Sequence, residues 1–160
     1  MRRADRAVTD ANQIASILSR AKILHLALFG GEYPYVVPMH YGFRFENGTL
    51  SFYLHCAKEG RKLDLLAQNP HVCAELECGV ALDEGGDVAC NYGAYYECLV
   101  AFGTANIVED TREKCEGLAL LMKHQTGRDF PVTEQMAQGV CVLRVDAEEY
   151  TAKARPKPAP

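Results

Sequence analysis

The sequence predicts a mainly β protein with flanking α-helices, in which an antiparallel sheet closes into a small barrel. Six segments have strand-like patterns, and most are joined by hairpin turns or short helices. Strands and helices do not alternate as they do in a doubly wound parallel sheet, and no glycine-rich dinucleotide fingerprint follows any strand. These observations favour an antiparallel sheet within a single domain.

The composition limits the classes of protein to consider. With 160 residues, the chain can bury a core without the help of disulfides or metals. Its formal net charge of −4 argues against general nucleic-acid binding. No apolar run is long enough to span a membrane, and the basic start lacks the apolar stretch of a signal peptide, so we expect a cytoplasmic protein. The domain is expected over residues 1–152, followed by a disordered, proline-containing tail at 153–160.

Seven cysteines are many for this length, but none forms a C-x-x-C pair or another zinc-site spacing. Four of them lie in apolar, strand-like runs, where cysteine acts as a small hydrophobic residue: Cys56, Cys73, Cys98 and Cys141. We therefore expect reduced thiols and no metal site. Cys90 lies in a glycine-rich stretch, and it is the one cysteine that we expect to be open to reaction.

Cap and turn signals divide the chain into elements. Asp10 is placed to cap a first helix, and Asn47-Gly48 is a hairpin signal. Gly103 is expected to bend a long strand. The expected strands are 23–29, 35–43, 50–55, 71–77, 95–108 and 140–150. The expected helices are 11–20, 60–68 and 109–125, with a loop at 79–93 and irregular structure at 126–138.

The most informative stretch runs from Tyr53 to Lys62, where a strand ends and a helix begins. Lys58, Arg61 and Lys62 lie at the start of that helix, where the helix dipole already presents partial positive charge. Because cations there oppose the dipole, the arrangement indicates a bound anion, and phosphate is the common one. The alternative is a solvated basic helix start.

A second signal is Pro38, which lies inside a strand-like segment. Proline cannot donate a ladder hydrogen bond, so the segment is expected at a sheet edge or beside a flat heteroaromatic ring held by backbone groups of Val37 to His40. An edge strand with a bulge is the alternative. Tyr95 and Tyr96 follow the glycine-rich stretch, and their amphipathic side chains suit an interface.

Taken together, these motifs resemble the pyridoxamine 5′-phosphate oxidase-like flavoproteins, and within them the Nim-type 5-nitroimidazole reductases. The matching pieces are Pro34 to Gly42, Tyr53 to Lys62, Gly103-Thr104-Ala105 and Asp110 to Lys114, with Arg2-Arg3 and Asp5-Arg6 at the start. The most specific motif is His55-x-Ala57-x-x-Gly60-x-Lys62. The resemblance covers about residues 1–150.

The resemblance implies a six-stranded split barrel that binds FMN at the interface of a homodimer. It assigns four residues to the FMN phosphate: His55, Lys58, Arg61 and Lys62. It places four more along the isoalloxazine: Val37, Pro38, Met39 and His40. It adds Tyr96, in a segment where the family commonly has Tyr-x-Ser-Val and this chain has a cysteine, Cys98, which is a weaker hydrogen-bonding group than serine.

The implied activity is that of an FMN-dependent oxidoreductase that passes electrons from NADH or NADPH to a small acceptor such as a nitroimidazole or another nitroaromatic. The cofactor supplies the chemistry, which agrees with the lack of a Ser/His/Asp or Cys/His pattern. His40 and His55 are the candidate catalytic residues, as donors to a flavin oxygen or a nitro group. The rival hypothesis is a flavin- or haem-binding protein that stores, senses or carries electrons, with one of these histidines as a haem ligand.

Overall fold

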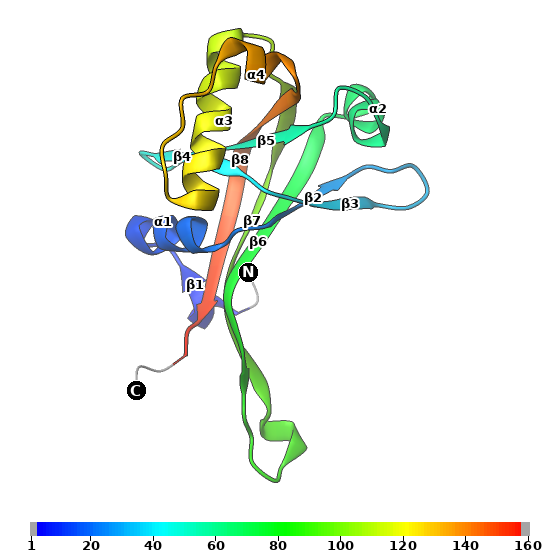
Figure 1. Cartoon of the computed structure of the whole chain (residues 1–160). Helices are drawn as coiled ribbons and strands as arrows, with labels where there is room; N and C mark the ends of the chain where they lie inside the picture. The colour runs from blue at the N-terminus through cyan, green and yellow to red at the C-terminus, as the bar shows by residue number, and fades with distance from the viewer. Residues whose placement is uncertain (1–2, 158–160) are drawn as a thin grey trace.

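The computed structural model describes residues 3–157, so that Arg2 and residues 158–160 lie outside the described part of the chain. One antiparallel sheet forms its centre (Figure 1), with strand order β3-β2-β6-β7-β8-β5-β4 and β1 paired to β8. The strands are β1 (Ala7–Val8), β2 (Leu24–Leu28), β3 (Tyr35–Met39), β4 (Gly42–Glu46), β5 (Thr49–Cys56), β6 (His71–Asp83), β7 (Gly93–Ile107) and β8 (Cys141–Arg155). The mainly β class is confirmed, with eight strands in place of the expected six.

Helices flank this sheet. They are α1 (Ala11–Arg20), α2 (Arg61–Gln68), α3 (Thr111–Thr126) and α4 (Glu134–Gln138), with 3₁₀ turns η1 (Ala4–Arg6) and η2 (Ala89–Asn91). The first helix has its predicted bounds, because the Asp10 carboxylate accepts a hydrogen bond from the Gln13 N–H at 2.9 Å. Within residues 3–157, no helix is both long and apolar enough to cross a membrane.

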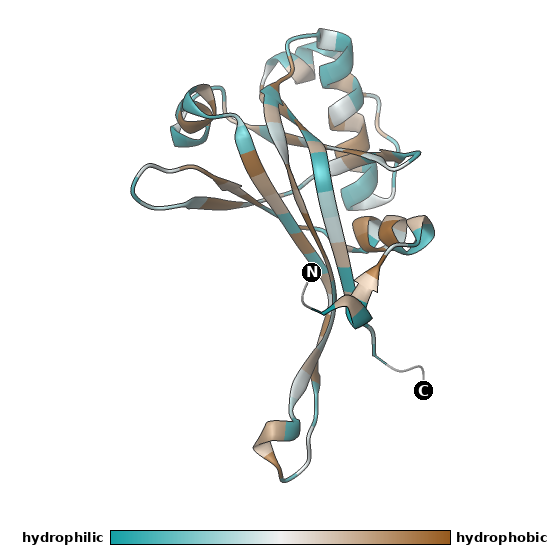
Figure 2. Ribbon diagram, turned by 180° about the vertical axis from the view of Figure 1, so that it is seen from behind, coloured by the Kyte–Doolittle hydropathy of each residue, from teal (hydrophilic) through white to brown (hydrophobic). Residues whose placement is uncertain are grey.

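The inner face of the sheet encloses a filled core. Along β2, buried leucines alternate with half-buried residues that face outward, as the two-residue period of a strand requires. Phe52, Leu54 and Leu76 are at most 1% exposed. Figure 2 shows the hydrophobic residues concentrated along the central strands. Because side chains fill the interior of so small a barrel, a ligand as large as a flavin has room only on its outside.

The segment that was expected as one strand at 35–43 is two strands joined at a corner. The corner consists of His40 and Tyr41, and the Tyr41 hydroxyl donates hydrogen bonds to the carbonyls of Leu18 (2.7 Å) and Ala21 (3.1 Å). These buried hydrogen bonds of Tyr41 hold the corner at which the chain leaves β3 and enters β4. Strand propensity alone does not predict such a corner. β3 and β4 are thereby the two edges of the sheet, so the edge position that Pro38 predicted is confirmed.

The hairpin of β6 and β7 projects beyond the barrel as an arm (Figure 1), where a loop at 79–93 was expected. Its register shifts between Cys78 and Ala81, and the strands then continue to their last pair, Asp83 with Gly93. The loop prediction is wrong for residues 79–83 and 93, which are strand, whereas residues 84–92 form the connection between the strands and contain η2. No residue of 79–93 is buried. With neither face buried, no alternating apolar pattern marks these residues as strands.

The base of the arm is held by polar contacts. The Tyr95 hydroxyl donates to Asp83 at 2.6 Å, and the same carboxylate is paired with the Arg155 guanidinium. Arg155 also lies over the Tyr95 ring, 5.3 Å from its centroid. The expected interface residue Tyr95 therefore braces the arm within its own chain.

Two other predictions need correction. β8 continues to Arg155, which pairs with Tyr96, so residues 153–155 belong to the sheet and not to a disordered tail. The region expected to be irregular at 126–138 contains α4, whose start is capped by the Thr133 hydroxyl. A register shift between Phe102 and Gly103 confirms the predicted bend in the long strand.

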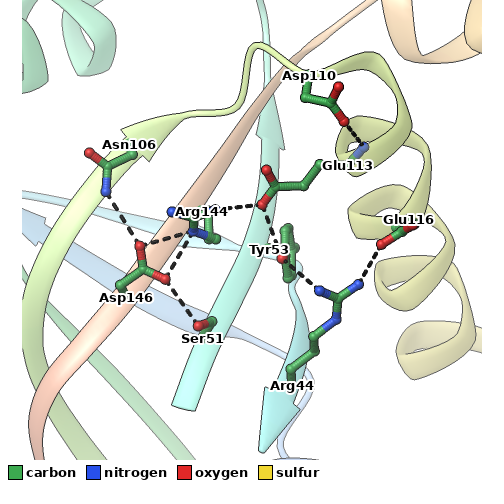
Figure 3. A network of polar contacts seen from close by, with 9 residues as sticks. All are labelled: Arg44, Ser51, Tyr53, Asn106, Asp110, Glu113, Glu116, Arg144 and Asp146. Carbon is green, nitrogen blue, oxygen red and sulfur yellow. Dashed lines mark hydrogen bonds and ion pairs between the residues drawn. The ribbon is translucent and has the colours of Figure 1, made fainter. Parts of the chain in front are cut away.

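A polar network joins α3 to the sheet (Figure 3). Arg144 of β8 binds Glu113 of α3 at 2.7 Å and Asp146 of its own strand at 2.9 Å. The Tyr53 hydroxyl donates to the same Glu113 carboxylate at 3.2 Å. Because the ionic groups are about a third exposed, solvent weakens these pairs, and we assign them mainly a positioning role.

We predict that Gly117→Ala destabilises the protein. Gly117 of α3 is buried against the Tyr53 ring, and a methyl group at this position would overlap that ring. Alanine is favoured over glycine in a helix by about 1 kcal/mol, yet we expect a net loss of about 1–3 kcal/mol in the free energy of unfolding from the overpacking. Urea unfolding measures it. In a Tyr53→Ala background the same substitution should be neutral or stabilising, and an equal loss in both backgrounds would contradict the contact.

Candidate functional site

The start of α2 is built differently from the starts of the other described helices. Asp10, Asp110 and Thr133 cap α1, α3 and α4 with their side chains, whereas α2 has no side-chain cap. Its N-cap is Gly60, at φ 128°, a conformation that side chains other than hydrogen disfavour. Nothing lies within 4 Å of the position that a Gly60 Cβ would take. The first turn of α2 therefore has no capping side chain, and the space beside Gly60 is open.

Three cations surround this helix start. Lys58 and Arg61 are exposed and Lys62 is half-buried, and within residues 3–157 none of the three forms an ion pair. The Arg61 guanidinium instead lies over the Tyr35 ring of β3, 4.9 Å from its centroid. By contrast, Arg44 is paired with Glu116 at 2.7 Å. We call the segment Ala57–Lys62 the basic turn.

His40 and His55 lie beyond the same end of the β4–β5 ladder. The ladder ends with Gly42 opposite Tyr53, so His40 precedes its last pair by two residues and His55 follows it by two residues. Burial lowers the pKa of His55, and the charges of His40 and Lys62 lower it further. The imidazole of His55 is therefore neutral at neutral pH and carries a single N–H donor.

The residues predicted along a flavin ring divide between the two faces of β3. Val37 and Met39 pack toward the core, so they offer only backbone groups to a ligand outside the barrel. Pro38 and His40 are exposed, and Pro38 pairs with His25 of β2 on the outer face. The structure thus gathers these four residues near His55 and Arg61, with two of them presenting side chains.

Tyr96 lies away from this group. β8 pairs with both regions, through Val142 opposite His55 and Arg155 opposite Tyr96. Thirteen strand positions separate Val142 from Arg155, which corresponds to about 40 Å of extended chain. Tyr96 accepts a hydrogen bond from Arg6 at 3.2 Å, with that guanidinium 5.9 Å from the ring centroid. One chain alone does not bring Tyr96 to the basic turn.

The outer face of the sheet carries an apolar cleft of about 680 Å³. Phe29 and Phe102 line it and remain 64% and 49% exposed, and Glu148 and Glu149 add carboxylates. None of the predicted cofactor residues lines this cleft, so it is a separate feature of the same face. Among residues 3–157, no cluster of histidine, cysteine and acidic side chains suits a metal ion.

Sequence reasoning missed two parts of the site. Tyr35 supports Arg61 through its ring, and the only signal was its place at the start of the Pro38 strand. The second is Gly60, which the sequence analysis placed as the first residue of the helix. It is instead the N-cap and supplies no capping side chain, and this depends on a backbone angle that composition does not encode.

The fold and the candidate site together define a split-barrel protein whose candidate site lies on the outside of the barrel. A family model described as pyridoxamine 5′-phosphate oxidase matches residues 10–154. The chain belongs to the pyridoxamine 5′-phosphate oxidase-like family. A comparison with curated proteins found no match.

Solved structures agree with this family. A candidate 5-nitroimidazole antibiotic resistance protein from Bacteroides thetaiotaomicron is 30% identical, with a TM-score of 0.75 over 92% of this chain and 85% of that one. The flavocytochrome Anf3 from Azotobacter vinelandii is 20% identical, with a TM-score of 0.77 over 99% of this chain and 73% of that one. A FAD and heme binding protein from Mycobacterium smegmatis is 15% identical, with a TM-score of 0.76 over 96% and 77%. The last two show the shared fold alone.

We predict that an NMR titration places the pKa of His55 below the ordinary value of about 6.5. His40→Gln and Lys62→Met should each raise it, because each removes a side chain whose charge lowers the pKa of His55. Lys123→Met, on the far end of α3, serves as the control. Because the pKa of His55 is lower in the folded protein than in the unfolded chain, the unfolded chain binds a proton at this position first as pH falls. His55 therefore lowers the free energy of unfolding as pH falls through the pKa of the unfolded chain. A His55 pKa that is the same in both variants as in the wild type would contradict the proposed proximity of His40 and Lys62 to His55.

Proposed function

We propose that the chain binds FMN with the phosphate on the basic turn, and that it is an oxidoreductase passing electrons from NADH or NADPH to a small acceptor. The observation that carries the proposal is the uncapped start of α2 beside three cations without ion-pair partners among the described residues. Glu59 lies within the turn and Asp64 in the first turn of α2, yet among residues 3–157 no carboxylate forms an ion pair with Lys58, Arg61 or Lys62. A dianionic phosphate supplies both the missing cap and the missing charge.

The available donors fit such an anion. The N–H groups of Leu63 and Asp64 already donate to the Gly60 carbonyl, at 2.9 and 3.3 Å. The N–H groups of Arg61 and Lys62 precede them and are free for a ligand, and the two side chains add charge-assisted hydrogen bonds. The guanidinium of Arg61 is already oriented by the Tyr35 ring, which reduces the entropy lost on binding.

The ring of the cofactor has a place next to the phosphate. Pro38 and His40 give β3 an exposed outer edge, and the neutral His55 offers a hydrogen-bond donor close by. When bound, FMN supplies the redox chemistry, so the chain needs no nucleophile of its own. The contribution of these residues is to hold the phosphate, to orient the ring against β3 and to donate hydrogen bonds to ring or substrate oxygens. We place the reaction in the cytoplasm, where reduced nicotinamides are available.

The relative from B. thetaiotaomicron supports a nitroimidazole, or another nitroaromatic, as the acceptor, since it is named for resistance to such compounds. An absorbance spectrum of the purified protein tests the cofactor: flavin bands support FMN, whereas a Soret band would favour haem. Steady consumption of NADH or NADPH with a nitroimidazole tests turnover. Tight flavin binding without turnover would favour a storage or carrier role.

We also propose a homodimer with two flavin sites, each built from both chains. The outer face exposes Phe29 and Phe102, and Tyr96 is remote from the basic turn of its own chain. A twofold partner covers the apolar face and brings the Tyr96 end of one chain to the basic turn of the other. Such a contact would exclude water from a ring that lies outside the barrel.

We predict that Lys62→Ala weakens FMN binding by about 1.5–3 kcal/mol, roughly 10- to 100-fold in Kd, because a charge-assisted hydrogen bond is lost. Riboflavin, which has no phosphate, should bind the variant and the wild type almost equally. Lys123→Ala, which removes an exposed cation on α3, is the matched control for net charge. Fluorescence titration gives all these constants. An unchanged FMN Kd in the Arg61→Ala, Lys62→Ala double variant would refute the phosphate assignment.

We predict that light scattering gives about twice the mass of the 17.7 kDa chain. Phe102→Glu should shift the protein toward the monomer and lower its FMN occupancy, since it places a charge on the face that the partner covers. Met136→Glu alters an apolar residue on α4 that is 61% exposed, against 49% for Phe102, and should leave the dimer intact. A monomeric wild type with full FMN occupancy would overturn the dimer proposal.

A further inference from the structure

Two cysteines face each other where β5 ends and β8 begins. Cys56 is the last residue of β5, Cys141 is the first of β8, and the two are Cα partners in the antiparallel ladder. Opposite residues in such a ladder have Cα atoms about 4.5–5.5 Å apart. Disulfides span Cα separations of about 4.4–6.8 Å. The backbone therefore already holds this pair at a separation that a disulfide can bridge.

The side chains are in contact as well. Residues directly opposite each other project to the same face of the sheet. The Cys141 thiol is buried and Cys56 is half-buried. Burial raises the pKa of Cys141, and the charge of Cys56 and a hydrogen bond between the two side chains raise it further. Cys141 is thus the protected thiol of the pair, and Cys56 is the one that a small oxidant reaches.

The remaining cysteines are not arranged in this way. In the part of the chain that the structure describes, no other two cysteines are Cα partners across strands. Cys98 is the Cα partner of Glu77, the residue before Cys78. Because neighbouring strand residues point to opposite faces, the thiols of Cys78 and Cys98 lie on opposite faces of the sheet, with Cys78 packed toward the core. Cys90 is exposed and lies in η2, within the connection between β6 and β7. The juxtaposition is specific to Cys56 and Cys141.

The position of this pair ties it to the ligand site. Cys56 directly precedes the basic turn, Ala57–Lys62. The position of the start of the turn therefore depends on the position of the end of β5. Strand ends tend to open, because their last ladder bonds have neighbours on one side only. A covalent bond from Cys56 to β8 would hold that end closed.

We propose that Cys56 and Cys141 form a reversible redox pair that a peroxide oxidises to a disulfide, which fixes the end of β5, and with it the basic turn, to the start of β8. In the first step the Cys56 sulfur attacks a peroxide oxygen, the O–O bond breaks, and Cys56 sulfenic acid and water (or an alcohol) are formed. In the second step the Cys141 sulfur displaces the sulfenic oxygen as water, and its proton leaves with that water. Two thiols lose two electrons in total, and one peroxide gains them.

Mass spectrometry tests the pair directly. Reduced, desalted protein is treated with a small molar excess of hydrogen peroxide, its free thiols are capped with N-ethylmaleimide, and the digest is mapped. We expect two fewer capped thiols, a linked peptide joining Cys56 to Cys141, and full reversal by dithiothreitol. Cys90→Ser, which removes an exposed thiol, should form the same link. Cys56→Ser, at a half-buried position that tolerates a hydroxyl, should form no disulfide.

Hydrogen exchange tests the consequence for the ligand site. The amides of the basic turn should exchange several-fold more slowly in the oxidised protein than in the reduced protein, while those of α4 stay unchanged. The proposal fails if folded protein forms no link between Cys56 and Cys141, or if the link appears only after unfolding in urea. It also fails if the link forms and exchange in the basic turn is unaltered. Each of these outcomes leaves the FMN proposal standing, because no measurement uses the cofactor.

Discussion

The arrangement of the candidate site depends on one buried hydroxyl, that of Tyr41. It donates to two carbonyls at the end of α1, and desolvation raises its pKa, so that it stays protonated and remains a donor. Its ring packs against Phe52 and lies 4.5 Å from the centroid of His124. Three elements therefore meet at this side chain: α1, the corner between β3 and β4, and α3. The corner contains His40, the preceding residue, whose charge lowers the pKa of His55. If the corner relaxed into a continuous strand, the two sheet edges would separate and the outer edge of the site would be lost.

A second constraint is the distribution of charge. Arg20, Arg44, Arg144 and Arg155 are each held by carboxylates, so the fold has both the acids and the geometry to neutralise guanidinium groups. In the described part of the chain, the cations of the basic turn have no carboxylate partner. Their charge also opposes the dipole of α2, because they lie at the start of that helix. Burial lowers the pKa of His55, the charge of His40 lowers it further, and Lys62 of the turn adds to the same shift. Natural proteins accept such local conflicts where a ligand later resolves them. Binding of the proposed phosphate would relieve these unfavourable charge interactions together.

The parts of the fold that sequence reasoning predicted are those set by neighbours in the chain. Asp10 marked a helix because a cap and an apolar stripe are both local signals, and Asn47-Gly48 marked a hairpin for the same reason. Pro38 marked a sheet edge because its missing N–H is a property of the residue itself. The failures all involve partners that lie far along the chain. The arm at 79–93 lacks a buried face, the end of β8 becomes a strand only by pairing with Tyr96, and the corner at Tyr41 is fixed by carbonyls of α1. The separation of Tyr96 from the basic turn follows from strand register, which no single stretch of sequence encodes.

The filled interior explains how one fold can carry different cofactors. Leu24, Leu26 and Phe52 are fully buried, so a change there would disturb the packing of the whole barrel. Residues on the outer face, such as Pro38 and Phe102, support no core and can change without that penalty. Relatives of this fold at 15–20% identity include a flavocytochrome and a protein that binds both FAD and heme. The common element between those proteins and this chain is the barrel. In this chain, the outer face of the sheet and the start of α2 present a basic turn, two histidines and an apolar surface. Binding specificity therefore has to be argued from those residues and not from the fold.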